Sequence, residues 1–182
     1  MKGCGVELDV DWRHFSLQEN NASAENQTPM WRESDLANTR SGLAALAGEA
    51  AKKLGAGDFD RFFLRLLMER HAGSRVPLND MEALIKIARE SGLDVGQFKE
   101  AMSDSSLVEK IENDHLEASE THGIFGTPTF VFENGQSAFV KTFIPPIGES
   151  VDVFRDFLNL FESKSYVGEI KRPQPPWPKG AV

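Results

Sequence analysis

Residues 123–131, GIFGTPTFV, are the stretch from which the fold of this chain is predicted. A glycine-rich turn and a Thr-Pro peptide lead into a β-branched and aromatic run, which predicts a strand over residues 129–133. An Asn-Gly dipeptide follows at residues 134–135, and this pair is the strongest short-range signal for a hairpin turn. We therefore expect an antiparallel hairpin whose returning strand covers residues 138–143.

Helical patterns flank this hairpin on both sides. Five helices are predicted before it, from apolar residues at a helical spacing: residues 43–54, 59–67, 82–88, 95–102 and 107–122. Asp58, Asn79 and Asp94 are the expected N-caps of the middle three. A sixth helix is expected over residues 151–161, after a Pro-Pro pair that ends the hairpin.

The first segment shows a strand pattern instead. In residues 6–13 apolar side chains alternate with charged ones, which predicts a strand with one buried face, at or near a sheet edge. The alternation places Glu7, Asp9 and Asp11 on the solvent face. Residues 18–34 are polar and lack a period, so we expect a long loop with anchors only at Met30 and Trp31.

Composition excludes several classes of function. The net charge of -8 and the absence of a Lys/Arg cluster argue against nucleic-acid and anionic membrane partners. No apolar stretch approaches the length of about 20 residues that spans a bilayer, and we expect a cytoplasmic protein. The single cysteine, Cys4, cannot form an internal disulfide, and no metal site is predicted because zinc-type Cys/His spacing is absent.

The stretch 123–131 resembles the cis-proline motif of the DsbA family of thioredoxin-fold proteins. Leu93-Asp94, Phe98 and the order of helices before the motif extend the resemblance over residues 6–161. The nearest branch is FrnE-like, which also includes relatives of 2-hydroxychromene-2-carboxylate isomerase and of kappa-type glutathione transferases.

The resemblance implies an α/β, thioredoxin-like (DsbA-like) sheet with a helical insertion between the first strand and a β-β-α unit. A single domain is expected over residues 1–182. We expect it to consist of thioredoxin-fold segments 6–17 and 124–163, a mainly helical insertion 36–122, and a proline-rich tail 164–182.

The resemblance also implies a site. About 5% of X-Pro bonds are cis in folded proteins, so the residues alone favour a trans Thr127-Pro128 bond, whereas the resemblance implies a cis one. It implies that Phe125, Gly126, Thr127 and Pro128 bind a thiol or disulfide substrate, either a protein or a small molecule. No cofactor is expected, although glutathione is an alternative substrate.

The family places a further strand and a Cys-x-x-Cys helix before the strand that corresponds to residues 6–13. This sequence holds no such pair, so no catalytic residue is assigned in it, and Cys4 is interpreted as a plain thiol. We expect a truncated product or fragment. The alternatives are that the two flanking strands close up directly, or that a second chain supplies the pairing, and open strand edges favour a homodimer.

Other polar residues are given structural interpretations. His115 and His122 could border the substrate groove, but partly exposed histidines near a helix end are the preferred reading. His14 is expected to be a packing residue. The tail residues 173–178 could be a polyproline ligand, but a tail that is disordered or lies along its own domain is expected.

Three functions remain open. The first is a thiol-disulfide oxidoreductase of the DsbA/FrnE kind whose cysteines are missing from this chain. The second is a glutathione-dependent isomerase or transferase, disfavoured because residues 138–146 lack the Trp-Gly-x-Asp-Arg stretch that such relatives carry. The third is a redox-inactive module for peptide binding or assembly.

Overall fold

The computed structural model describes residues 9–22, 28–33, 35–72, 74–142, 145–146 and 148–170. The chain divides into two compact units, which we describe separately. The helical unit is residues 13–119, and the hairpin unit combines residues 1–12 with residues 120–182. The single domain expected over residues 1–182 stays a prediction.

The helical unit contains five main helices and several short ones. In chain order its elements are α1 (Leu17–Asn20), η1 (Met30–Arg32), η2 (Leu36–Asn38), α2 (Gly42–Leu54), α3 (Ala56–His71), α4 (Met81–Glu90), α5 (Val95–Met102) and α6 (Ser106–Leu116). A π-helical turn, η3 (Glu117–Thr121), continues α6 across the boundary of the unit. Five helices were expected here, and the predicted ranges overlap α2 to α6.

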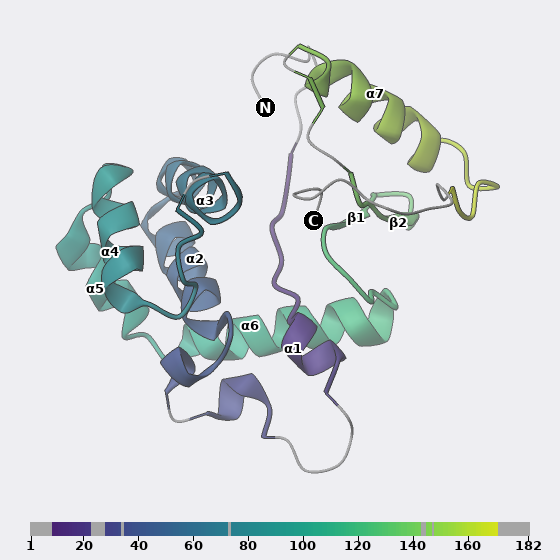
Figure 1. Ribbon diagram of the computed structural model, residues 1–182. Coiled ribbons are helices and arrows are strands. Elements are labelled where there is room, and N and C mark those ends of the chain that lie inside the picture. The colour runs from purple at the N-terminus through teal and green to yellow at the C-terminus, as the bar shows by residue number, and fades with distance from the viewer. Residues whose placement is uncertain are drawn as a thin grey trace. The chain divides into compact units, whose positions relative to one another are not determined.

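Helix α2 lies at the centre of this unit and contacts α3, α4, α5 and α6 (Figure 1). Its apolar residues recur at the predicted spacing, and Ala47 and Ala50 are fully buried. Small side chains let neighbouring helices approach closely. The larger volume of the core comes from Phe62 on α3 and Phe98 on α5, both fully buried, with ring centroids 5.4 Å apart.

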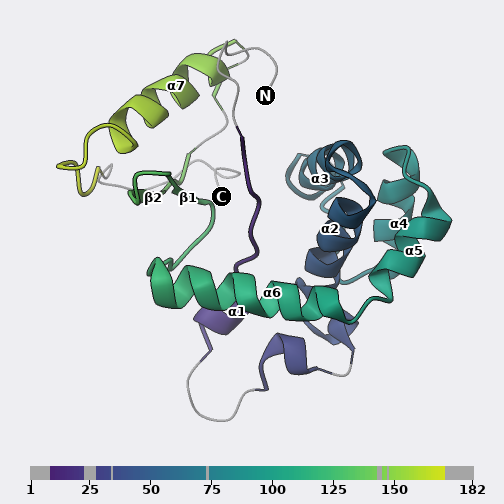
Figure 2. The same cartoon turned by 180° about the vertical axis from the view of Figure 1, so that it is seen from behind.

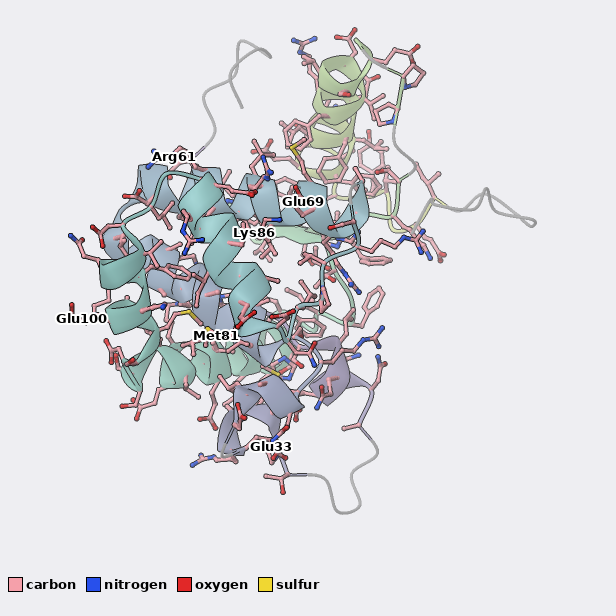
Figure 3. All side chains as sticks on the ribbon, turned by 60° about the vertical axis from the view of Figure 1, so that its left-hand side comes forward. Glu33, Arg61, Glu69, Met81, Lys86 and Glu100 are labelled. Atoms are coloured by element: carbon pink, nitrogen blue, oxygen red, sulfur yellow. The ribbon has the colours of Figure 1, made fainter. Side chains whose placement is uncertain are left out.

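Helix α6 runs across one end of the α2–α5 bundle, as the views from front and back both show (Figures 1 and 2). Met30, 2% exposed, joins the core, and Trp31 packs against it. The expected anchoring role of these two residues in a long polar segment is therefore confirmed. The outer surface of the unit is charged, and Arg61, Lys86 and Glu100 project from it (Figure 3).

The helix starts depart from the prediction in two places. Asp94 caps α5, since its carboxylate accepts a hydrogen bond from the Gln97 amide, as expected. Asp58, however, lies inside α3, because Gly55 alone separates α2 from α3 and its φ of 153° ends one helix immediately before the other begins. The cap of α4 is Asp80 rather than Asn79; its carboxylate accepts from two amides of the first turn.

The hairpin unit contains β1 (Thr129–Val131), β2 (Ser137–Phe139) and α7 (Ser150–Phe161). The strands pair antiparallel, with Phe130 opposite Ala138. Gly135, at φ 80°, forms the predicted turn. Both strands are shorter than the expected 129–133 and 138–143, because the turn takes up residues 132–136 and, beyond Phe139, the pairing of the described residues ends with the bond from the Val140 amide to the Pro128 carbonyl.

Aromatic packing joins the hairpin to α7. The Phe130 ring lies 4.8 Å from that of Phe157 and 6.1 Å from that of Phe154, centroid to centroid. No side chain of α7 is fully buried, so the described part of this unit has a thin core.

The prediction of a first strand is wrong over the residues that the structure describes. Residues 9–13 have no regular secondary structure, and residues 6–8 lie outside the described residues. Val10 and Trp12, expected on a buried face, are 45% and 38% exposed. The physical reason is that a strand needs a hydrogen-bonded neighbour, and within the described residues the only ladder joins β1 to β2. Among the described residues no helix has the length and apolar character needed to cross a membrane.

Candidate functional site

The predicted site residues form one exposed loop between η3 and β1. Phe125 is 65% exposed, Thr127 and Pro128 are exposed, and Gly126 is buried. The peptide bond joining Thr127 to Pro128 is cis, the isomer that the resemblance implies. The Thr129 hydroxyl donates a 2.7 Å hydrogen bond to the Gly126 carbonyl and so holds the loop against the start of β1.

The Phe139 ring lies beside the backbone of Gly126. The centroids of Phe125 and Phe139 are 5.2 Å apart. A Cβ added to Gly126 would lie 2.9 Å from the Phe139 ring, closer than real Cβ contacts allow. Glycine is therefore required for this ring to lie on the loop backbone.

The ladder decides which backbone groups of β1 face outward. The Val140 amide donates to the Pro128 carbonyl at 3.0 Å, and the Phe132 amide donates to the Gln136 carbonyl at 2.8 Å. Bonded and non-bonded pairs alternate in an antiparallel ladder, so the amides and carbonyls of Thr129 and Val131 point away from β2. The structure thus brings the four predicted substrate residues to the start of β1, which is an edge strand among the described residues. Their role in binding substrate stays a prediction.

A second group of polar residues lies in the helical unit around Asp114, and it was not predicted from the sequence. Its side chain is 1% exposed. One carboxylate oxygen accepts from Arg13 Nη1 at 3.1 Å and from Lys110 Nζ, and the other accepts from the His14 amide at 3.2 Å. These bonds attach residues 13 and 14 to α6, about 100 positions away along the chain.

His14 continues this group toward α2. Its Nε2 lies 2.8 Å from Oε1 of Glu49, and Lys52 Nζ lies 2.5 Å from the same oxygen. Burial alone would raise the pKa of Glu49, but hydrogen bonds from His14 and Lys52 outweigh it and lower the pKa from 4.5 to about 2. The interpretation of His14 as a packing residue is incomplete, since its ring makes a polar contact. We call His14, Glu49 and Asp114, with their cationic partners, the polar junction.

The sequence matches the DSBA-like thioredoxin domain family over residues 5–158 of its 182 residues. The chain belongs to the DSBA-like thioredoxin domain family. Its mostly helical structure with a small antiparallel sheet is consistent with the α/β, thioredoxin-like fold of that family. A comparison with curated proteins finds no match.

In this DSBA-like domain the polar junction is a structural feature. Ligand atoms of His14, Glu49 and Asp114 lie within 4.8 Å of one another, a grouping that could hold a metal ion. However, the carboxylates already accept hydrogen bonds from Lys52, Lys110 and Arg13. A divalent cation would have to displace these charges, so the donor set fits an ion-pair network better than a metal centre.

His115 and His122 differ in burial in this DSBA-like domain. His115 is 6% exposed, and its ring lies against those of Phe15 and Trp31 at centroid distances of 5.0 and 5.2 Å. Burial lowers the pKa of His115, opposed by the charge of Glu19. Its Nδ1 accepts from the Ser16 amide at 3.2 Å, so the neutral ring carries its proton on Nε2. The reading of His115 as partly exposed is wrong, whereas His122 is exposed.

Proposed function

We propose that this DSBA-like chain is the substrate-binding part of a thiol-disulfide oxidoreductase of the DsbA/FrnE kind. The observation that carries the proposal is the exposed Thr127-Pro128 peptide at the end of the outward edge of β1, in a member of this family. An extended substrate can align its main chain with such an edge, which brings its sulfur to the loop.

Disulfide exchange by a dithiol mechanism requires two thiols, and this sequence contains one. A thiolate attacks one sulfur of the substrate disulfide, a mixed disulfide forms, and the other substrate sulfur leaves as a thiolate. A second thiolate then displaces the reduced substrate and becomes half of a new disulfide. Because the sequence contains one cysteine, Cys4, at least one of these two thiols must come from outside this sequence. Cys4 itself lies outside the described residues.

The single cysteine also favours a second candidate, the redox-inactive module that binds peptides. The two candidates share the loop and differ in whether a sulfur in the ligand matters. A ligand series that varies only this sulfur separates them.

The test is an amide NMR titration of the full chain. The ligands are a short Gly/Ser peptide whose central cysteine carries an S-methylthio group, the same peptide with alanine at that position, and oxidised glutathione. We expect the disulfide peptide to shift the Thr127 and Thr129 amides in a saturable way and the alanine peptide to do so at least about tenfold more weakly.

Three other results would change the conclusion. Equal shifts from the disulfide and alanine peptides would support the redox-inactive module. Saturable shifts from glutathione alone would indicate a small-thiol enzyme. The absence of shifts at both amides with every ligand would remove this loop from consideration as a substrate site.

A further inference from the structure

Helix α3 carries a second apolar stripe, on a different face from the one that enters the core. The core-facing residues of this helix are buried, whereas Leu64, Leu67 and Met68 are 61%, 38% and 56% exposed. Residues three and four positions apart are neighbours on the surface of a helix, so these three side chains form one continuous strip. We call them the outer stripe of α3.

A hollow of about 280 Å³ adjoins the outer stripe, where α3 meets the C-terminal end of α4. Figure 3 shows Arg61 of α3 and Lys86 of α4 on this outer surface of the helical unit. Arg61 Nε donates to the Ser91 carbonyl at 3.0 Å and so connects the two helices beside the hollow. A row of side chains next to a hollow is the surface into which another helix packs. The hollow is lined by Arg61, Leu64, Arg65, Met68, Glu90 and Ser91.

Positive charge flanks the outer stripe, although the chain as a whole is acidic. Residues 61–75 contain four arginines and one glutamate, which gives a net charge of +3, against −8 for the whole sequence. The side chains of Arg61 and Arg65 are 55% and 44% exposed, and ion pairs with acidic residues of α3 and α4 offset part of their charge.

These two arginines keep donors that can bind a ligand. Arg61 uses Nε and Nη2 in its printed bonds, and Arg65 uses Nη2 alone. Among the described residues, Nη1 of Arg61 and both Nε and Nη1 of Arg65 have no partner. Guanidinium groups bind carboxylates through charge-assisted hydrogen bonds, so the flank of the stripe is suited to acidic side chains.

The secondary structure of this surface decides the conformation of a partner. Main-chain groups in the middle of α3 are bonded within the helix, so the surface offers no backbone partners to an extended segment. A polypeptide that buries its backbone here must satisfy its own main-chain groups, as a helix does. Charge disfavours pairing of the outer stripe with the same stripe of a second copy, because arginines would face arginines.

We propose that the outer stripe of α3 and the adjoining hollow bind an amphipathic helix of another polypeptide, with acidic residues beside its apolar face. Its apolar side chains cover the outer stripe, and its carboxylates accept hydrogen bonds from Arg61 and Arg65. The site lies in the helical unit and requires neither the Thr127-Pro128 loop nor a thiol. The proposal therefore goes beyond the proposed function and is independent of it.

Three fluorescent peptides test the proposal on the unaltered chain. Each has about 16 residues and a lactam bridge that keeps it helical, since isolated helices of this length are marginal in water. The first has leucines at i, i+3, i+4 and i+7, flanked by glutamates. The second has the same composition with its leucines dispersed around the helix, and the third has lysines in place of the glutamates. We expect saturable binding of the first, measured by anisotropy, and binding at least about tenfold weaker for the other two at low salt.

Two pairs of variants of the full chain locate the site. Met68→Gln removes an apolar side chain from the outer stripe, and Met81→Gln removes one that is 40% exposed at the start of α4, the end away from the hollow. Arg65→Gln removes a charge beside the stripe, and Lys99→Gln removes one from α5. We expect Met68→Gln and Arg65→Gln to weaken binding of the first peptide about fivefold, and their controls to leave it within about twofold. Circular dichroism checks that each variant is folded.

Several outcomes would overturn the proposal. They are the absence of saturable binding of the first peptide, equal affinity for the second or third peptide, or equal effects of the two variants within either pair. A dimer of the unaltered chain that Met68→Gln dissociates would make a second copy the occupant instead. None of these measurements uses the Thr127 and Thr129 amides, so failure here can be distinguished from failure of the titration with the disulfide peptide.

Discussion

His14 Nε2 lies 2.8 Å from Oε1 of Glu49, and this hydrogen bond connects the first residues of the helical unit to the middle of α2. Glu49 is 5% exposed, although it lies on the same helix as the apolar residues of the core. A buried carboxylate is stable only when it is paired, so the position of His14 depends on Glu49 and that of Glu49 depends on its partners. Two predictions follow from the polar junction.

Acid is expected to unfold the protein partly through Glu49. Its folded-state pKa of about 2 lies below its ordinary value of 4.5, so its contribution to stability is complete above pH 4.5. This contribution is lost as the pH falls from 4.5 toward 2. The free energy of unfolding, measured with urea at a series of pH values, should depend less on pH in this window for Glu49→Gln than for the unaltered chain.

Asp104 is the control for this measurement. Hydrogen bonds from Lys53 and Ser106 lower its pKa from 3.8 to about 2, a range that lies inside that of Glu49, but the ion pair with Lys53 is exposed to solvent. Asp104→Asn should change the pH dependence less than Glu49→Gln does, because water screens exposed pairs. Identical pH profiles for Glu49→Gln and the unaltered chain would contradict the assignment.

Asp114→Asn should destabilise the helical unit. Asparagine is neutral and has one acceptor oxygen, so it cannot replace the carboxylate that accepts hydrogen bonds from Arg13, Lys110 and the His14 amide. The site is almost completely buried. We expect a loss of about 1–3 kcal/mol in the free energy of unfolding, measured by urea denaturation. Glu117→Gln is the matched control, since Glu117 also pairs with Arg13 at 3.1 Å but is 52% exposed. Comparable losses in both variants would indicate that burial of Asp114 does not matter.

Gly126→Ala should displace the Phe139 ring from the loop. The added methyl group would lie 2.9 Å from that ring, which must move and so separate from Phe125. Aromatic proton NMR should show changed shifts for both rings, with a cost in stability of about 1 kcal/mol. Gly168→Ala is the control, because a Cβ at Gly168 would meet nothing within 4 Å. Unchanged ring shifts in Gly126→Ala would show that the Phe139 ring does not lie beside Gly126 in solution.

The chain alone should not catalyse reduction of insulin by dithiothreitol. Catalysis requires a thiol to form a mixed disulfide and a second thiol to resolve it, and the sequence contains one cysteine. We expect the rate of insulin precipitation to equal that of the reaction without protein, and Cys4→Ser to leave it unchanged. A reproducible acceleration that Cys4→Ser abolishes would show that one thiol is enough.

The sequence predicted the elements that depend on local signals. Helix spacing, the Asp94 cap and the Asn-Gly turn act within a few residues, and each is present in the structure. The loop that we propose binds substrate was indicated by its motif, and its cis peptide bond was indicated by the resemblance rather than by the residues. The predicted strand is wrong over the described residues 9–13, because a strand needs a neighbouring strand as well as its own alternation.

The polar junction could not be predicted for a related reason. Asp114 and His115 lie on α6, and their partners lie near residue 14, so nothing in the local spacing connects them. A buried face of α6 was visible in the apolar residues around Ile111. The signal available for Asp114 was a carboxylate that falls four residues after Lys110 on a largely apolar stripe, and this pattern is common on exposed helices.

The bonds between residue 14 and residue 114 also affect the order in which the protein can assemble. They close a segment of about 100 residues, so they cannot form until a ribosome has released most of the chain. Contacts between helices that follow one another in the chain, such as α2 and α3, are local and can form early in folding. The entropic cost of closing a segment rises only slowly with the length of the segment. The charges of Arg13, Asp114 and Lys110 would therefore come together late, after the helices of the bundle have packed.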